Sequence, residues 1–217
     1  MTRKTSKTPA HARRNALVEK IRARGDSPYN IWMVRPPFED DDLLLTSDPA
    51  MELFYWVEGE PSFVDISYAP LRSAMDAGTQ LDGREFAQCV MGDETTLTVV
   101  WCGAATPDTA PGSETQFLRV TLTDLNANAQ RVENWRRIVP CIRRVRLHPT
   151  AMLERQVLLA LRGVKHRSVR YLVNARPEGP AALTVGAIAI LLRKRLIIAD
   201  VDTRPWSSNT LVWSVQP

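Results

Sequence analysis

Residues 47–68 read SDPAMELFYWVEGEPSFVDISY, and this stretch sets the order of elements in the first half of the chain. Ser47 followed by Pro49 is typical of a helix start, because serine caps free amides and proline fits the first turn. We therefore predict a helix over Ala50–Val57. Phe63–Tyr68 then alternates apolar and polar residues, which predicts a strand with one buried face.

The next elements continue a mixed α/β pattern. Glu85–Met91 and Thr95–Cys102 flank a short polar turn, which predicts a β-hairpin. Gln116–Leu122 alternates again and predicts another strand. Asp124–Val139 has helical periodicity, and Pro140 is expected to break or kink that helix. The predicted fold class of this half is an α/β domain.

The last third of the chain has a different pattern. We predict three helices over Ala151–Leu161, Ser168–Ala175 and Thr184–Arg193, followed by strands over Leu196–Val201 and Thr210–Val215. Three helices followed by a hairpin is the order of a winged helix. The predicted organisation is a basic, partly disordered arm over 1–28, an α/β domain over 29–146 and a winged-helix-like domain over 147–217.

Charge is distributed unevenly along the chain, although the net charge is only +4. Residues 1–37 are strongly basic, residues 38–124 strongly acidic, and residues 131–176 strongly basic again. Such asymmetry favours a basic surface for a polyanion. The alternative is that the acidic and basic segments neutralise each other within the fold.

Several classes of protein are not expected. No run of 18 apolar residues occurs, so we expect no membrane span and no membrane partner. The N-terminus has no apolar segment of the signal-peptide type, which favours a cytoplasmic, nucleoid-associated protein. Cys89, Cys102 and Cys141 have no zinc-binding spacing, and we expect reduced thiols.

The order helix, strand, hairpin, strand and helix between residues 47 and 139 resembles the core of the PD-(D/E)xK nucleases. More closely it resembles the TnsA-type endonuclease subunits of transposons. Residues 47–68 look like the first helix and strand of that family, and AQRVENWRRIVP at Ala129–Pro140 looks like its late "N-W-R-R" helix. The resemblance implies a restriction-endonuclease-like mixed sheet with flanking helices, a winged-helix-like tail, and assembly with a transposase and double-stranded DNA.

The metal site that this resemblance implies is degenerate. The helix carboxylate falls on Glu52, and Glu85 stands where the family has an aspartate. The position of the acid and lysine falls on Thr98–Cys102, which contains neither. No lysine occurs between Lys20 and Lys165, so the catalytic ammonium is missing. We therefore expect no nuclease activity and no cofactor, unless Glu52 and Glu85 form a rearranged site for Mg²⁺ or Mn²⁺.

Clusters of arginine and lysine are the candidates for DNA contact, because guanidinium groups suit phosphate oxygens. The helix Thr184–Arg193 stands where a recognition helix would lie, but it offers few polar groups to base edges. A winged helix that contacts phosphate or a protein fits equally well. The candidate DNA-binding residues are Arg13, Arg14, Arg136, Arg137, Arg143, Arg144, Arg146, Lys165, Arg167, Arg170, Arg193, Lys194 and Arg195.

Three functions follow from these observations. The first is a non-catalytic DNA-associated subunit of a transposition complex, which binds DNA, a transposase partner or both. The second is an active metal-dependent endonuclease with a rearranged site. The third is a protein-interaction or regulatory module without DNA binding.

Overall fold

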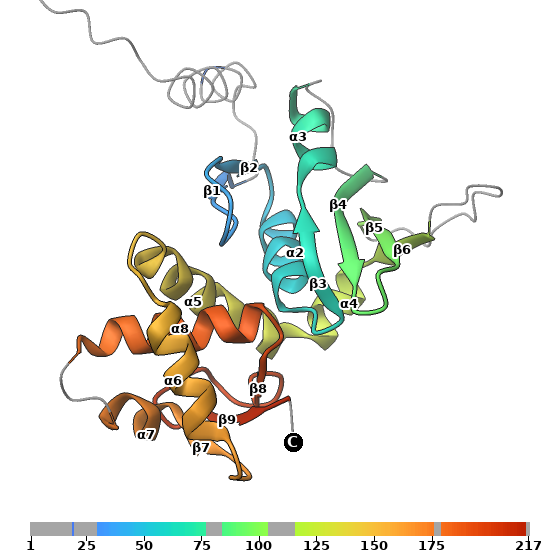
Figure 1. The fold of residues 1–217 in the computed structure, drawn as a ribbon. Coiled ribbons are helices and arrows are strands. Elements are labelled where there is room, and N and C mark those ends of the chain that lie inside the picture. Colours follow the sequence, from blue (N-terminus) through green and yellow to red (C-terminus); the bar gives the residue numbers. More distant parts are fainter. Residues whose placement is uncertain (1–18, 20–29, 77–83, 104–115, 176–178, 216–217) are drawn as a thin grey trace, which may run out of the picture.

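A computed structural model describes residues 19, 30–76, 84–103, 116–175 and 179–215 of this chain (Figure 1). The first described elements form a small antiparallel hairpin, β1 (Trp32–Val34) and β2 (Leu43–Leu45). This hairpin was not predicted from the sequence. It leads directly into helix α2 (Asp48–Gly59), which begins as predicted, with the Ser47 hydroxyl accepting a hydrogen bond from the Ala50 amide.

A four-stranded mixed sheet follows α2. Its spatial order is β3-β4-β5-β6, and only the last pair, β5 with β6, is parallel. Helices flank this sheet, so the predicted mixed α/β class is confirmed (Figure 1). The elements are β3 (Phe63–Ser67), α3 (Ala69–Asp76), β4 (Arg84–Met91), β5 (Thr96–Trp101) and β6 (Gln116–Val120).

Two helices occupy the region predicted as one. Helix α4 (Leu122–Ala127) ends at Asn128, whose backbone is not helical, and α5 (Ala129–Val145) begins immediately after it. The predicted interruption at Pro140 is wrong in position, because α5 continues past this proline to Val145. Tertiary packing explains the continuation, since both Val139 and Ile142 beside the proline are buried.

The C-terminal part contains the three predicted helices and the two predicted strands. They are joined by an additional two-residue strand, β7, which was not predicted, and the three strands form an antiparallel sheet in the order β7-β9-β8. The elements are α6 (Ala151–Leu161), β7 (Arg167–Ser168), α7 (Val169–Asn174), α8 (Ala181–Arg193), β8 (Ile197–Ala199) and β9 (Leu211–Ser214).

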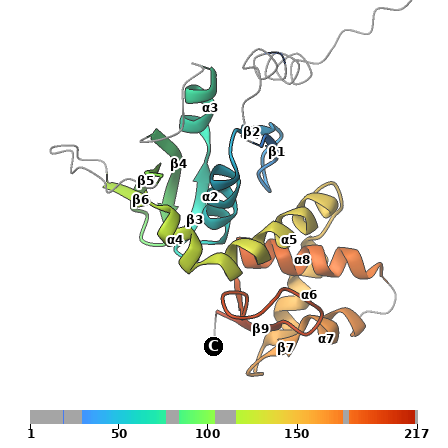
Figure 2. The same cartoon turned by 180° about the vertical axis from the view of Figure 1, so that it is seen from behind.

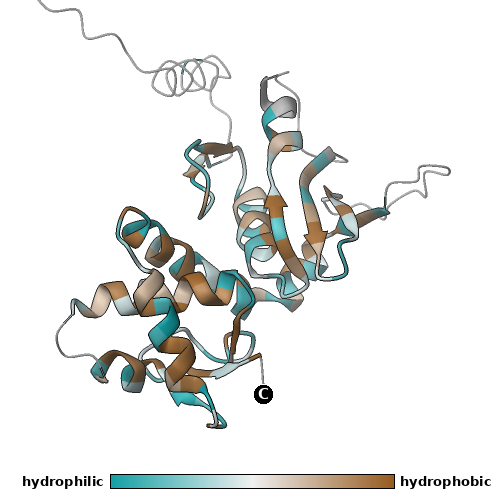
Figure 3. Ribbon diagram, in the orientation of Figure 1, coloured by the Kyte–Doolittle hydropathy of each residue, from teal (hydrophilic) through white to brown (hydrophobic). Residues whose placement is uncertain are grey.

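Helix α5 lies between α2 on one side and α8 on the other, as the view from behind shows (Figure 2). Buried residues of both parts form one continuous hydrophobic cluster. The predicted boundary at residue 146 falls at the end of this shared helix, and the division into domains stays a prediction. Helix α8 is apolar along much of its length (Figure 3) and almost entirely buried from Thr184 onward.

Helices α5 and α8 approach each other closely at Gly186. A Cβ atom placed on this residue would lie 2.4 Å from both γ-carbons of Val145, so α8 can approach α5 closely only because residue 186 has no side chain. Among the described residues no helix is both long and apolar enough to cross a membrane. The three cysteines are free thiols.

Candidate nucleic-acid interface

Glu52 lies on α2, half-buried, and faces both an acidic and a basic neighbour. Burial raises the pKa of its carboxyl group, Asp48 raises it further, and Arg136 of α5 opposes the rise. Asp48 itself is held by the N-terminal hairpin, since it accepts hydrogen bonds from the indole of Trp32 at 2.7 Å and from the amide of Asn30. The guanidinium of Arg136 lies 5.6 Å from the centre of the Trp32 ring. Glu52 therefore lies where α2, β1 and α5 pack against one another.

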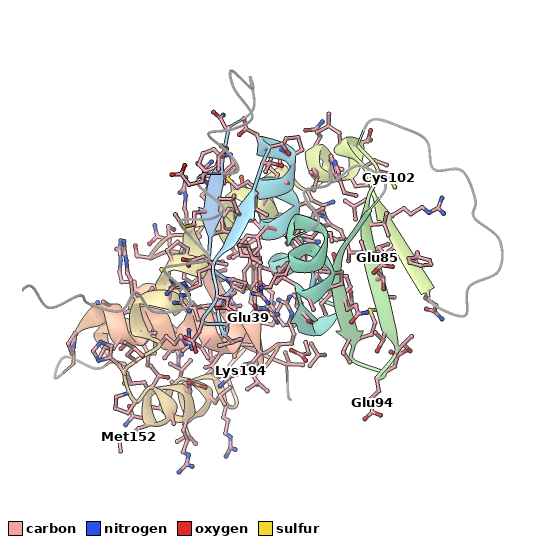
Figure 4. All side chains as sticks on the ribbon, turned by 90° about the horizontal axis from the view of Figure 1, so that it is seen from above. Glu39, Glu85, Glu94, Cys102, Met152 and Lys194 are labelled. Carbon is pink, nitrogen blue, oxygen red and sulfur yellow. The ribbon has the colours of Figure 1, made fainter. Side chains whose placement is uncertain are left out.

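Glu85 is exposed on β4 and is labelled in Figure 4 on the sheet side of the molecule. Its partner on β5 is Val100, which in turn lies opposite Arg119 on β6. In the part of the chain that the structure describes, no three His, Cys, Asp or Glu residues are placed to hold a metal ion.

Three of the five positions to which the resemblance assigns the acid and the lysine are part of the core, and the other two, Val100 and Cys102, are half-buried. Val99 is fully buried, and Thr98 and Trp101 are also buried. Apolar side chains packed in this way offer no oxygen ligands to a hard cation. A metal site assembled here would require both new carboxylates and an opened core.

The arginines of α5 lie in different environments. Arg137 pairs with Glu133 one turn earlier at 2.8 Å, and Arg146 pairs with Asp40 at 2.6 Å. Arg143 donates to backbone carbonyls of the loop before β2, the shortest bond being 2.9 Å to Glu39. Arg144 is exposed and forms no ion pair with the described residues. The predicted cluster of five is therefore divided between intramolecular contacts and solvent.

The three basic residues at the end of α8 all form polar contacts with other residues of the chain. Arg193 is buried and its Nε lies 2.6 Å from a carboxylate oxygen of Glu58. Arg195 donates to the carbonyls of Phe63, Glu58 and Glu60, and stacks 5.3 Å from the centre of the Trp135 ring. Lys194, more exposed, pairs with Glu154 at 2.7 Å. Arg193 and Arg195 therefore cannot reach DNA in this conformation.

The turn between α6 and α7 presents basic groups to solvent. Arg162, Lys165 and Arg170 are exposed, and none forms an ion pair with the residues that the structure describes. Arg167 is half-buried, with its guanidinium carbon 4.3 Å from the centre of the Tyr171 ring. We call Arg162, Lys165, Arg167 and Arg170 the basic turn.

Two residues with notable contacts or positions were not predicted. Arg162 of the basic turn was not among the candidate residues, although its position three residues before Lys165 in a segment without acids could have indicated it.

Asn134 on α5, part of the "N-W-R-R" string, bridges this helix to the β8–β9 loop. Its amide donates to the Val201 and Arg204 carbonyls, and its oxygen accepts from the Trp206 amide. The remaining candidates Arg13 and Arg14 lie outside the described residues.

Comparison with known proteins adds no relative. No protein-family model, no curated protein and no solved structure matches the chain.

Proposed function

We propose that this chain is a non-catalytic DNA-associated protein that contacts phosphates through the basic turn. The observation that carries the proposal is the absence of acidic partners there, within the described residues, whereas Arg146, Arg193 and Lys194 each pair with a carboxylate. Segment 162–170 contains no aspartate or glutamate. A cluster of cations without carboxylate partners suits a polyanion.

Local contacts hold two of these cations in place. The guanidinium of Arg167 lies over the Tyr171 ring, and Arg170 donates to the Ser208 hydroxyl at 3.2 Å while its backbone amide donates to the Ser208 carbonyl. A side chain that is already ordered loses less conformational entropy on binding. The turn can therefore bind phosphate without rearrangement of the neighbouring backbone.

The order α6-β7-α7-α8-β8-β9 and the sheet order β7-β9-β8 support a winged-helix-like architecture. However, α8, which would be the recognition helix, is covered by α5 and α6. The β8–β9 loop is likewise held against α5 by Asn134. We therefore propose binding through phosphate contacts with little dependence on base sequence.

Membership of a transposition complex is the more specific part of the proposal. It is supported by the resemblance in residues 47–68 and 129–140 and by the order of α2, β3, β4, β5 and β6 around a mixed sheet. The apolar, buried nuclease positions on β5 support a subunit that assembles on DNA without cutting it. In such a complex the cutting activity belongs to another subunit.

A second candidate function, contact with a protein partner, is favoured by the exposed side of α6. Met152 and Leu159, two turns apart, are 72% and 52% exposed, and Leu147 just before the helix is 93% exposed. Arg155 is also exposed on this helix. Exposed apolar side chains of this size next to basic ones are typical of protein-interaction surfaces. A transposase is the partner that the resemblance implies.

Fluorescence anisotropy with a labelled duplex across a salt series tests the DNA-binding proposal. We expect log affinity to fall linearly with log salt concentration. Changing Lys165 and Arg170 together to glutamine should reduce the slope by about 2, because each lost phosphate contact removes about 0.9. The matched control is Arg204→Gln, which removes an exposed cation that already lies 3.6 Å from Asp200.

Two further measurements make the outcome decisive. A chain without residues 1–24 separates the contribution of the arm, with Arg13 and Arg14, from that of the basic turn. Absence of binding by the full chain at low salt would overturn the proposal and leave the α6 surface as the candidate functional site. An unchanged slope in the double variant would assign DNA contact to another basic segment.

A further inference from the structure

An open cavity of about 360 Å³ at the surface is lined by residues of β1, α2 and α5. Its size is in the range of small-molecule sites. The residues that line it are Met33, Val34, Arg35, Phe54, Tyr55, Val139, Pro140 and Arg143. Most are apolar, and two polar groups among them have unused hydrogen-bonding capacity.

Arg143 is the first of these groups. Its Nη1 donates to carbonyls of the loop before β2, and no carboxylate of the described residues pairs with it. The neighbouring guanidinium groups are matched, Arg35 with Asp42 and Arg146 with Asp40. Burial lowers the pKa of Arg143, the positive charges of Arg146 and Arg35 lower it further, and the negative charges of Asp40 and Asp42 oppose this fall. Among the described residues Arg143 therefore lines the cavity as a guanidinium without a carboxylate hydrogen-bond partner.

The Tyr55 hydroxyl is the second group. It makes no hydrogen bond to any residue that the structure describes. Burial raises the pKa of this hydroxyl, with Arg136 opposing the rise, so it is protonated at neutral pH and can donate. Tyr55 on α2 and Arg143 on α5 thus bring two donors to one cavity from two separate helices.

We infer that this cavity binds a small organic monoanion, a single carboxylate joined to a compact apolar group. The carboxylate would accept from the Arg143 guanidinium and the Tyr55 hydroxyl, as charge-assisted pairs require. The apolar group would contact Phe54, Val139 and Pro140. A second negative charge is disfavoured, because the other lining guanidinium, Arg35, already pairs with Asp42 and the acidic loop 39–42 lies beside the site.

The same chemistry has two sources: a free acid, or the C-terminal residue of another polypeptide with an apolar side chain. Capture of a terminal carboxylate beside an apolar pocket is a known mode of peptide recognition. This inference is independent of DNA binding, since it uses none of the residues of the basic turn.

Titration calorimetry with hexanoate and with hexanamide, which has the same shape and no charge, tests the inference. We expect hexanoate to bind at least about tenfold more tightly than hexanamide. Arg143→Met should abolish the preference, and Tyr55→Phe should weaken hexanoate binding by about threefold or more. The matched control is Arg144→Met, one residue along the same helix and exposed, which should leave both affinities unchanged.

If Arg143→Met fails to fold, Tyr55→Phe still tests the inference, because this substitution removes only the hydroxyl oxygen and keeps the ring and its packing contacts. Equal affinity for acid and amide, or no binding of hexanoate up to about 10 mM, would overturn the inference. So would hexanoate binding that neither Tyr55→Phe nor Arg143→Met weakens. Acetyl-alanyl-leucine, with its C-terminal amide as the uncharged control, then distinguishes the two sources. If the acetyl-dipeptide binds more tightly than hexanoate, the natural ligand is a polypeptide C-terminus; if it binds more weakly, the ligand is a free acid.

Discussion

Glu58 of α2 and Arg193 of α8 form an ion pair in the interior of the protein, with 2.6 Å between Oε2 and Nε and side chains only 1% and 5% exposed. The two residues are 135 positions apart. The hydroxyl of Tyr68 donates to the other carboxylate oxygen at 2.9 Å. This pair joins the sheet-bearing part to the C-terminal part and explains why the basic end of α8 is not free for other partners.

Arg193→Met should destabilise the protein by about 3–5 kcal/mol, because it leaves a buried carboxylate without its counter-charge. Urea unfolding followed by circular dichroism measures the loss. Lys194→Met is the matched control: its ion pair with Glu154 is more exposed, and we expect a cost of about 1 kcal/mol or less. The double variant Glu58→Gln/Arg193→Met should be more stable than Arg193→Met alone. A cost as small as that of the control would show that the pair is not desolvated.

Asn134→Ala should cost about 2–4 kcal/mol, since it leaves two carbonyls and one amide of the β8–β9 loop without partners. The loop should also loosen from α5, which faster acrylamide quenching of Trp206 fluorescence would report. Asn126→Ala, on the exposed side of α4, removes the same amide and should be nearly neutral. If both variants unfold at the same urea concentration, the bridge contributes nothing to stability.

Local signals in the sequence were sufficient for most helices and strands. Ser47 and Pro49 mark the start of α2, and the alternation in Phe63–Tyr68 marks β3, because capping and pleating depend on near neighbours. The continuation of α5 past Pro140 was not predictable in this way. It depends on packing against α2 and α8, which are distant in the sequence.

The roles of the basic residues were the least predictable. Arg193 and Arg195 flank Lys194 in a run that resembles a phosphate-binding surface, and only the fold brings Glu58 and Trp135 to them. The lack of a carboxylate partner for Arg143 was equally hidden, since it depends on how Arg35 and Arg146 pair in three dimensions. Lys165 and Arg170 are exposed, as a basic segment without acids suggests, and their contact with DNA stays a prediction.

Gly186→Ala should destabilise the protein by about 1–3 kcal/mol, although alanine alone favours a helix by about 1 kcal/mol. The new methyl group would lie 2.4 Å from Val145, so α8 and α5 must separate. Thermal unfolding of the single variant, of Val145→Ala and of the double variant measures this clash. We expect the double variant to lose less free energy of unfolding than the two single variants lose when their losses are added. Strict additivity would mean that the two helices do not compete for this space.

The buried thiol of Cys89 makes stability depend on pH in the alkaline range. Burial raises its pKa to about 12, and the negative charge of Glu58 contributes to the rise. An unfolded cysteine has a pKa of about 8.5. Between these two values the folded state holds the proton and the unfolded state does not. The stability from this group is therefore complete below about pH 8.5 and is lost as the pH rises towards about 12.

Between about pH 7.5 and about pH 10.5 this difference should remove about 2–3 kcal/mol from the free energy of unfolding. Cys89→Ala should abolish that part of the loss, because alanine has no proton to release. The cavity left by the lost sulfur is the same at both pH values and cancels in the comparison. Cys102→Ala, just after the end of β5, is the matched control. Its free energy of unfolding should fall with rising pH as steeply as that of the unmodified chain. An identical pH dependence of Cys89→Ala and the unmodified chain would mean that the Cys89 thiol ionises as readily in the folded protein as in the unfolded one.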